Sequence, residues 1–287
     1  MNYDLIALDL DGTLVDRGER ISAASRDALA DAAAAGLKVV PCTGRAWRES
    51  ADVLRGLPGL DVGVFSSGSM VADFRSAAVL NTAAFDPQLA LGIVEILAPL
   101  PHAVLVYQDI EQTGRDFLIT GTGEVSANTR GWFERNRLTT AHIPQVTAAD
   151  LAHSLRIGVV AHGNAALDAE AAVRERFADR INAHCIAGLP VAGTEHHGPV
   201  YLLEIFSAGV NKWRGLRWLA EHRGIDPARV AAVGDEVNDL AMLKGAALGV
   251  AMGQASGAVK AAADRETRSC ADDGVAHAIH HILEGSW

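Results

Sequence analysis

The sequence predicts an α/β fold in which a parallel sheet is interrupted by an inserted α+β segment. Two observations lead to this prediction. At both ends of the chain, short apolar runs alternate with helical patterns, which is typical of βαβ units with right-handed crossovers. The middle of the chain instead places strand-like runs next to each other across short polar connections, as at Tyr107 and Phe117, which indicates hairpins. A length of 287 residues favours two domains, since a domain holds roughly 100 to 200 residues.

The N-terminal elements follow from apolar runs and helix-end signals. Residues 4–9 form a short apolar run that ends in acid, as expected of a buried strand in a parallel sheet. A helix is predicted at residues 22–35, because Ser22 is a suitable N-cap and Gly36 a suitable stop. Residues 37–40 and 62–65 are predicted to be the next two strands of the same sheet.

The remaining elements define the two predicted domains. In the middle of the chain, strands are predicted at residues 79–85, 103–107, 117–120, 155–160 and 181–185, and helices at 87–97 and 167–177. Beyond a Gly/Pro/His-rich linker at 188–198 the first pattern returns, with strands at 201–206, 230–233 and 247–251 and helices at 212–223, from 240, at 255–263 and at 274–283. We therefore expect a discontinuous domain at residues 1–83 and 190–287 and an inserted α+β domain at residues 84–189.

Composition and charge exclude several kinds of partner. The chain carries 25 Lys and Arg against 35 Asp and Glu, a net charge of −10, whereas nucleic acids and anionic membranes are bound through clustered cations. Three widely spaced cysteines indicate neither a disulfide framework nor a zinc site, which favours a reducing compartment. The sequence shows no signal-peptide pattern and no apolar stretch long enough to span a membrane. We expect a cytoplasmic protein, and the sequence leaves its oligomeric state open.

Polar residues directly follow three of the predicted parallel strands. They form the segments DLDGT (residues 9–13), CTGR (42–45) and GDEVND (234–239). Loops at the carboxyl ends of parallel strands face one crevice, so we expect these segments to converge. Their aspartates would repel one another unless a cation neutralises them, and an all-oxygen donor set favours Mg²⁺. Together with Thr43, a Gly-containing turn and a lysine, this indicates phosphoryl transfer, in which a carboxylate can be the nucleophile.

The segment DLDGTLV at residues 9–15 resembles the first motif of the haloacid dehalogenase (HAD) superfamily of phosphatases. The other motifs of that superfamily follow in order, with Thr43 in CTGR, Lys212 in GVNK, and then GDEVND. Matches at residues 203–205, 249–253 and 272–276 are similar to the Cof-type branch, subfamily IIB. The resemblance implies a Rossmann-like core at residues 1–83 and 190–287 and, between the second and third motifs, a C2-type cap at residues 84–189 that selects the substrate.

The resemblance also implies a function and a role for each motif residue. It implies a Mg²⁺-dependent phosphatase that acts on a small phosphorylated metabolite such as a sugar phosphate. Asp9 would be the nucleophile that forms an aspartyl-phosphate, and Asp11 the general acid/base. Mg²⁺ would be held by Asp9, by Asp235 and by the backbone carbonyl of Asp11. The other motif residues would bind the phosphoryl group or the substrate, or orient the residues that do: Thr43, Gly44, Lys212, Asn238 and Asp239.

Two segments depart from the family pattern. Family members usually carry Asn-Gly where this chain has Ser67 and Gly68, and Gly-Asn-Ala where it has Gln254 in the middle position, which affects the expected substrate contacts. Several polar residues have no assigned role. They are Arg45, the linker residues His196 and His197, and His277, His280 and His281, which are spaced to lie on one face of a helix. The last three histidines could bind a metal, but no further ligand is evident, so we expect them to form a polar helix face.

Alternative functions use the same motifs. A phosphomutase of the same superfamily would also form the aspartyl-phosphate but would transfer the phosphoryl group to an acceptor other than water. A non-enzymatic phospho-acceptor or sugar-phosphate sensor would not turn substrate over. A calcium loop starting at residue 9 is excluded, because its sixth and twelfth positions are Leu14 and Arg20. Cys42 and Arg48 have the spacing of the cysteine phosphatases, but the residues on either side do not fit that motif.

Overall fold

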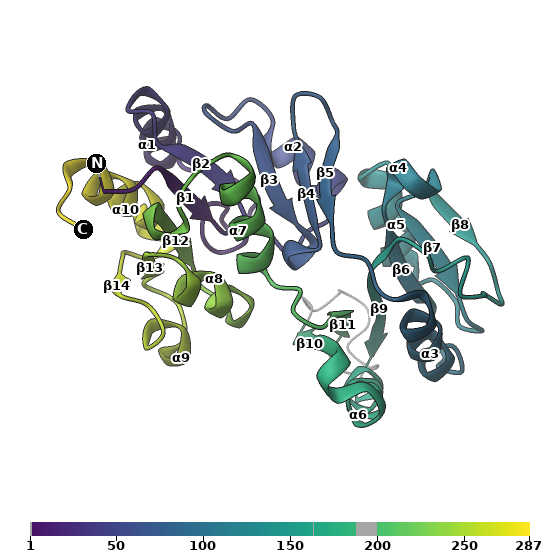
Figure 1. Cartoon of the computed structure of the whole chain (residues 1–287). Coiled ribbons are helices and arrows are strands. Elements are labelled where there is room, and N and C mark those ends of the chain that lie inside the picture. Colours follow the sequence, from purple (N-terminus) through teal and green to yellow (C-terminus); the bar gives the residue numbers. More distant parts are fainter. Residues whose placement is uncertain (1, 163, 188–199) are drawn as a thin grey trace. The chain divides into compact units, whose positions relative to one another are not determined.

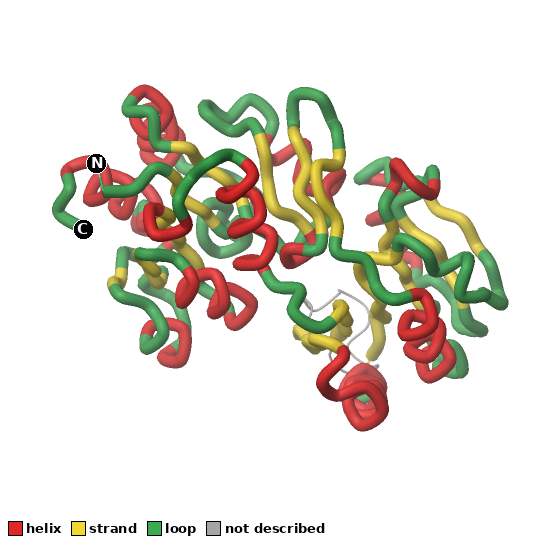
Figure 2. The backbone as a smooth tube through the Cα atoms, viewed as in Figure 1, coloured by secondary structure: helices red, strands yellow, loops and turns green. Residues whose placement is uncertain are grey.

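A computed structural model describes residues 2–162, 164–187 and 200–287 of the chain (Figures 1 and 2). The chain divides into two compact units. Met1–Asn81 and Asn211–Trp287 together form one of them, called the terminal unit below, and Thr82–Val210 forms the other, called the inserted unit. None of the described helices combines the length and the apolar character that a membrane crossing requires.

The terminal unit is built on a five-stranded parallel sheet with the order β14-β13-β12-β1-β2. Its strands are β1 (Leu5–Leu8), β2 (Lys38–Pro41), β12 (Val230–Gly234), β13 (Leu248–Ala251) and β14 (Arg265–Glu266). Both β1 and β12 are buried along their whole length, as apolar runs are in a sheet covered on both faces. Because β1 pairs in parallel with β12 and with β2, the polar segments that follow these three strands begin at the same edge of the sheet.

Among its described residues, the terminal unit has six α-helices: α1 (Ala23–Ala34), α2 (Trp47–Leu54), α7 (Lys212–His222), α8 (Leu240–Gly245), α9 (Gly257–Lys260) and α10 (Gly274–Glu284). The serine cap predicted for α1 is present, since Ser22 accepts the N–H of Ser25 at 3.1 Å. Helix α1 packs against α10, at the side of the unit where both chain ends lie in Figure 1. The helix predicted at residues 255–263 is shorter, because the chain turns after α9 to enter β14.

A separate small sheet contains β3 (Val62–Phe65), β4 (Met70–Asp73) and β5 (Val79–Thr82), in that order. The prediction that residues 62–65 continue the parallel sheet is therefore wrong. The partner of β3 is β4, which runs antiparallel to it, and the link to the first sheet is an isolated parallel bridge between Cys42 and Val64. A tight 3₁₀ turn at Ser66–Gly68 folds the chain back, which apolar patterning alone does not reveal.

The inserted unit contains a six-stranded sheet with the order β10-β11-β9-β6-β7-β8. Its strands are β6 (Val104–Gln108), β7 (Phe117–Thr120), β8 (Thr140–His142), β9 (Ser154–His162), β10 (Ile181–Ala187) and β11 (Val200–Ser207), and its helices are α3 (Pro87–Leu97), α4 (Ile110–Thr113), α5 (Ala127–Arg135) and α6 (Ala165–Phe177). Apolar residues of α3 and α6 join those of the strands in one hydrophobic cluster. The predicted antiparallel pairing of Tyr107 with Phe117 is present, although the short α4 forms part of the connection.

The C-terminal boundary of the inserted unit differs from the predicted boundary at residues 189 and 190. The division lies between Val210 and Asn211, because β11 pairs antiparallel with β9 and β10 and so belongs to the sheet of the inserted unit. The sequence predicts the largely apolar run at 201–206 as a strand of the parallel sheet, since periodicity cannot distinguish one kind of buried strand from another. The predicted linker at 188–198 lies outside the described residues.

Candidate active site

Lys212 is completely buried at the start of α7 and lies between two carboxylates. Its Nζ donates to Asp9 Oδ1 at 2.5 Å and to Asp239 Oδ1 at 2.6 Å. The backbone around Asn211 is fixed closely, because Gly68 has a φ of +96° and a Cβ there would lie 2.0 Å from the Asn211 carbonyl oxygen. A helix N-terminus disfavours a cation, so the two carboxylates account for the position of Lys212.

Asp239 is also completely buried and uses both of its carboxylate oxygens. While Oδ1 accepts from Lys212, Oδ2 accepts the backbone N–H groups of Asp235 and Glu236, each at 3.0 Å. These bonds close the loop after β12 and hold Asp235 at the strand end. Asp239 therefore orients both the lysine and the loop that carries the third buried carboxylate.

Two other loops hold Asp235 in place. Thr13 Oγ1 donates to Asp235 Oδ1 at 2.9 Å. Gln254 Nε2 donates to Asp235 Oδ2 at 3.2 Å and to the Gly12 carbonyl at 2.6 Å, and its Oε1 accepts the N–H of Cys270 at 3.0 Å. At Gly12, where φ is +83°, a Cβ would lie 2.5 Å from Asp235 Oδ2, so the close approach of the two loops requires glycine.

The cluster is short of positive charge. Burial raises the pKa of the Asp9 carboxyl well above its ordinary value, and the charge of Asp239 adds to this effect while Lys212 opposes it. Burial also raises the pKa of Asp235. For Lys212, burial acts against the charged form, but the charges of Asp239 and Asp9 outweigh it and raise the pKa of the ammonium group. With all three carboxylates ionised, the cluster and Lys212 together carry a net charge of −2, which a divalent cation would neutralise.

The donor geometry fits a hard cation. Asp9, Asp235 and Asp239 each offer a carboxylate oxygen, and these three oxygens lie within 4.8 Å of one another. Since Asp239 is committed to Lys212 and to backbone N–H groups, Asp9 and Asp235 are the side chains best placed to hold an ion. All of the donors are oxygen atoms, which hard divalent cations prefer.

The Asp11 carboxylate is bound by Arg45. Arg45 Nε donates to Asp11 Oδ2 at 2.9 Å and Nη2 donates to Oδ1 at 2.5 Å, which is the two-pronged geometry of a strong pair, and Nη1 donates to Glu19 at 3.4 Å. The hydrogen bond to Asp11 is the main reason why the pKa of Arg45 is raised. The backbone N–H of Arg45 donates to Thr43 Oγ1 at 3.0 Å, which fixes the buried Thr43 hydroxyl. A role for Asp11 in metal binding rests on its backbone carbonyl and stays a prediction.

Gly44, Ser67 and Asn238 come together from three loops. A Cβ on Gly44 would lie 3.5 Å from Ser67 Oγ and 3.7 Å from Asn238 Nδ2. Asn238 Oδ1 and Ser66 Oγ are buried and have no hydrogen-bond partner among the residues that the structure describes. Buried polar atoms are normally satisfied, so Asn238, which lies beside Gly44, offers an oxygen that a hydrogen-bonding ligand could satisfy.

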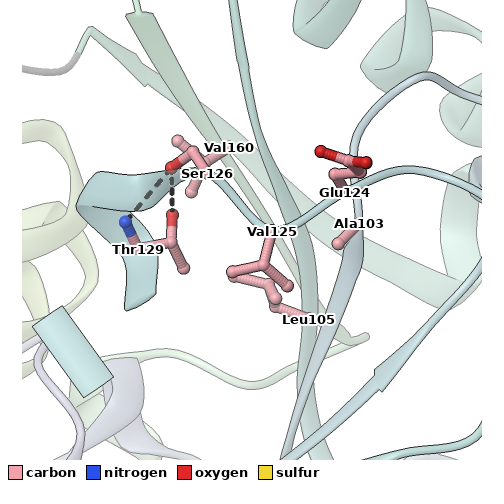
Figure 3. Close-up of a pocket in the computed structure, with 7 residues that line it drawn as sticks. All are labelled: Ala103, Leu105, Glu124, Val125, Ser126, Thr129 and Val160. Carbon is pink, nitrogen blue, oxygen red and sulfur yellow. Dashed lines mark hydrogen bonds between the residues drawn. The ribbon is translucent and has the colours of Figure 1, made fainter. Parts of the chain in front are cut away.

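The remaining candidates are placed as follows. Cys42 is completely buried, and burial strongly raises the pKa of its thiol, which disfavours the thiolate that a cysteine phosphatase needs. His196 and His197 lie outside the described residues. In the inserted unit, a pocket of about 10 Å³ is lined by Ala103, Leu105, Glu124, Val125, Ser126, Thr129 and Val160 (Figure 3). That volume holds about one water molecule and is far too small for an organic phosphate.

Sequence reasoning missed three contacts of the site: Arg45 to Asp11, Thr13 to Asp235 and Gln254 to Asp235. The departure of Gln254 from the usual asparagine was the available signal for the last contact, and Arg45 stands next to two motif residues. Their partners lie on other loops, however, so that only the folded chain shows how far each side chain reaches.

Comparison with known proteins places the chain in a family. Residues 6–279 match the family model described as haloacid dehalogenase-like hydrolase. The Bacillus subtilis protein YxeH is 30% identical over 289 residues, which cover 98% of each chain. The 5-amino-6-(5-phospho-D-ribitylamino)uracil phosphatase YitU of the same bacterium is 29% identical over 95% of this chain and 94% of its own length. A solved sugar phosphatase of HAD subclass IIB has the same fold, with a TM-score of 0.70 and 22% identity over 97% of this chain and 98% of its own. The chain therefore belongs to the haloacid dehalogenase-like hydrolases and, among them, to the phosphatases.

Proposed function

We propose that the protein is a Mg²⁺-dependent phosphomonoester hydrolase that acts on a small phosphorylated metabolite, with sugar phosphates as the first candidates. The observation that carries this proposal is the buried arrangement of Asp9, Lys212 and Asp239 with Asp235 beside it. Phosphoryl transfer through an aspartyl-phosphate requires a nucleophilic carboxylate, here Asp9, which would also help to hold the metal, a second metal-binding carboxylate, here Asp235, and a fixed cation, here Lys212.

In the proposed reaction, a carboxylate oxygen of Asp9 attacks phosphorus. A P–O bond to Asp9 forms, the ester P–O bond breaks, and the leaving alkoxide takes a proton from Asp11. Asp11 then takes a proton from water, whose oxygen attacks the same phosphorus and releases Asp9 and inorganic phosphate. Lys212 orients the Asp9 carboxylate and stabilises charge on the transferring group, to which Thr43, Gly44 and Asn238 donate hydrogen bonds.

The metal and the acid/base have distinct supports in this proposal. When bound, Mg²⁺ supplies positive charge to the phosphoryl oxygens, and Asp9, Asp235 and the carbonyl of Asp11 would hold it. Gln254 and Thr13 keep Asp235 oriented. Arg45 donates two hydrogen bonds to the Asp11 carboxyl group and so positions it for proton transfer to the leaving group and from water.

The substrate class is proposed from similarity and from the site together. The relative YitU is named for a phosphate ester of a ribityl chain, which is a polyhydroxylated leaving group. We propose a leaving group of that kind for this chain, selected by the inserted unit acting as a cap. A panel of hexose phosphates, pentose phosphates and ribityl phosphates, compared by kcat/KM, ranks the candidates.

Hydrolysis of p-nitrophenyl phosphate tests the proposed reaction. We expect turnover that requires Mg²⁺ and falls on the order of 10³-fold or more in Asp9→Asn, because the variant lacks the nucleophile. The matched control is Asp27→Asn on the exposed face of α1, which should keep full activity. Undiminished turnover by Asp9→Asn would overturn the mechanism. Conversion of a hexose phosphate into an isomer without phosphate release would indicate the phosphomutase, and a phosphoenzyme that persists without turnover would indicate the phospho-acceptor.

A further inference from the structure

Helix α10 carries a pair of histidines that the proposed reaction does not use. His277 and His281 lie one helical turn apart and are both half-buried. Their Nε2 atoms are 3.2 Å apart, and their rings meet at 71° with centroids 4.5 Å apart. The indole of Trp287 stacks on His281 at 4.5 Å and 10°, so the pair has an aromatic wall on one side.

The tautomer of each ring depends on the hydroxyl group beside it. Thr267 Oγ1 donates its only proton to the Gly274 carbonyl at 2.8 Å, so at 2.9 Å it accepts from His277 Nδ1. Ser286 Oγ lies 2.7 Å from Nδ1 of His281 and 3.1 Å from the carbonyl of the same residue, so it accepts from Nδ1 when its own proton goes to the carbonyl. In that arrangement both histidines carry their proton on Nδ1.

Two neutral rings in these tautomers present lone pairs to each other. Each Nε2 is then an acceptor, and two acceptors 3.2 Å apart repel unless a cation lies between them. Two imidazole nitrogens bound to one metal at about 2.0–2.1 Å, with an angle between tetrahedral and square, are about 2.9–3.4 Å apart. The observed separation lies within that range, and hydrogen-bonded Nδ1–H groups are the usual support of metal-binding histidines.

We propose that His277 and His281 form a binding site for one borderline divalent transition-metal ion through their Nε2 atoms, with water in the remaining positions. Nitrogen donors distinguish this site from the all-oxygen cluster around Asp9, so the ions expected are Zn²⁺, Ni²⁺ and Cu²⁺, with Cu²⁺ bound most tightly. Burial, His281, Arg268 and His280 lower the pKa of His277, which keeps the Nε2 lone pair available at neutral pH.

A Cu²⁺ titration of the metal-stripped protein, with excess Mg²⁺ to occupy the carboxylate cluster, tests the proposal. We expect one Cu²⁺ per chain with the nitrogen splitting of two imidazoles in its electron paramagnetic resonance spectrum, and quenching of fluorescence that Trp287→Phe removes. His277→Asn and His281→Asn should each weaken binding by about tenfold or more. His280→Asn is the matched control, since it removes a neighbouring exposed histidine of the same helix and should leave affinity within about twofold.

The outcomes separate the metal site from its competitors. Equal affinity in His281→Asn and His280→Asn would show adventitious binding and overturn the proposal. If the asparagine variants fail to fold, ¹⁵N NMR of the wild-type protein decides: Zn²⁺ should shift the Nε2 resonances of His277 and His281 together. Nε2 resonances that show one shared proton and do not respond to Zn²⁺ would overturn it.

Discussion

Replacing Lys212 by methionine removes the cation at the centre of the site and keeps most of the side-chain volume. Any decrease in the free energy of unfolding therefore comes mainly from lost charge and hydrogen bonding, because the substitution leaves little empty space in the core. Lys212 is completely buried and donates to Asp9 and Asp239 at 2.5 and 2.6 Å. Each hydrogen bond to a charged group contributes about 1.5–3 kcal/mol, and removing one partner of a buried ion pair costs about 3–5 kcal/mol.

We therefore expect Lys212→Met to lower the free energy of unfolding by about 3–5 kcal/mol in metal-free buffer. Urea denaturation followed by circular dichroism measures this difference. The matched control is Arg217→Met on the same helix, because Arg217 makes an exposed ion pair with Glu221 at 2.7 Å. That change should shift the free energy by less than about 1 kcal/mol.

A double-mutant comparison checks the cause of the loss. Since Lys212→Met leaves Asp9 and Asp239 facing each other, adding Asp9→Asn should recover part of the lost stability. Equal losses in Lys212→Met and Arg217→Met would refute the charge argument, and so would the absence of any recovery in the double variant.

Three further outcomes are expected. Arg45→Ala should lower kcat about tenfold, because Asp11 loses the arginine that binds both of its carboxylate oxygens. Phosphoenzyme should then accumulate as a burst in stopped-flow assays. An unchanged kcat would contradict the positioning role of Arg45. Gln254→Ala should weaken Mg²⁺ binding by about tenfold in calorimetry, since Asp235 and the Gly12 carbonyl lose a shared donor, and unaltered affinity would contradict this. Mg²⁺ at 100 times its Kd should stabilise the wild-type protein by about 2.7 kcal/mol and raise its melting temperature. Asp235→Asn should lose most of that rise. An equal rise in the variant would show that the ion binds elsewhere.

Much of the buried carboxylate cluster could be predicted from sequence because its spacing follows a rule of the fold. Asp9 follows β1 and Asp235 follows β12, and parallel neighbours end at the same edge of the sheet. Lys212 was expected there from the motif order alone. Its buried position between two carboxylates depends on how α7 packs, which no local pattern encodes.

The errors have physical causes as well. A largely apolar run such as residues 201–206, in which Glu204 is the one charged residue, fits a parallel or an antiparallel strand. Its partners are β9, which is distant in the sequence, and β10, which is separated from it by residues outside the described ranges. The turn at Ser66–Gly68 depends on positive φ angles at two serines, which composition does not predict. Contacts of long side chains, such as Gln254 with Asp235, depend on the final geometry of three loops.

Chemical trapping of the phosphoenzyme is the most direct test of the role proposed for Asp9. Borohydride reduces an aspartyl-phosphate to homoserine, and peptide mass spectrometry locates the modified residue. With substrate and Mg²⁺ present, we expect homoserine at position 9 of the wild-type protein, and none without substrate or in Asp9→Asn. Turnover without any modification at position 9, or modification at Asp235 instead, would contradict the assignment of Asp9 as the nucleophile.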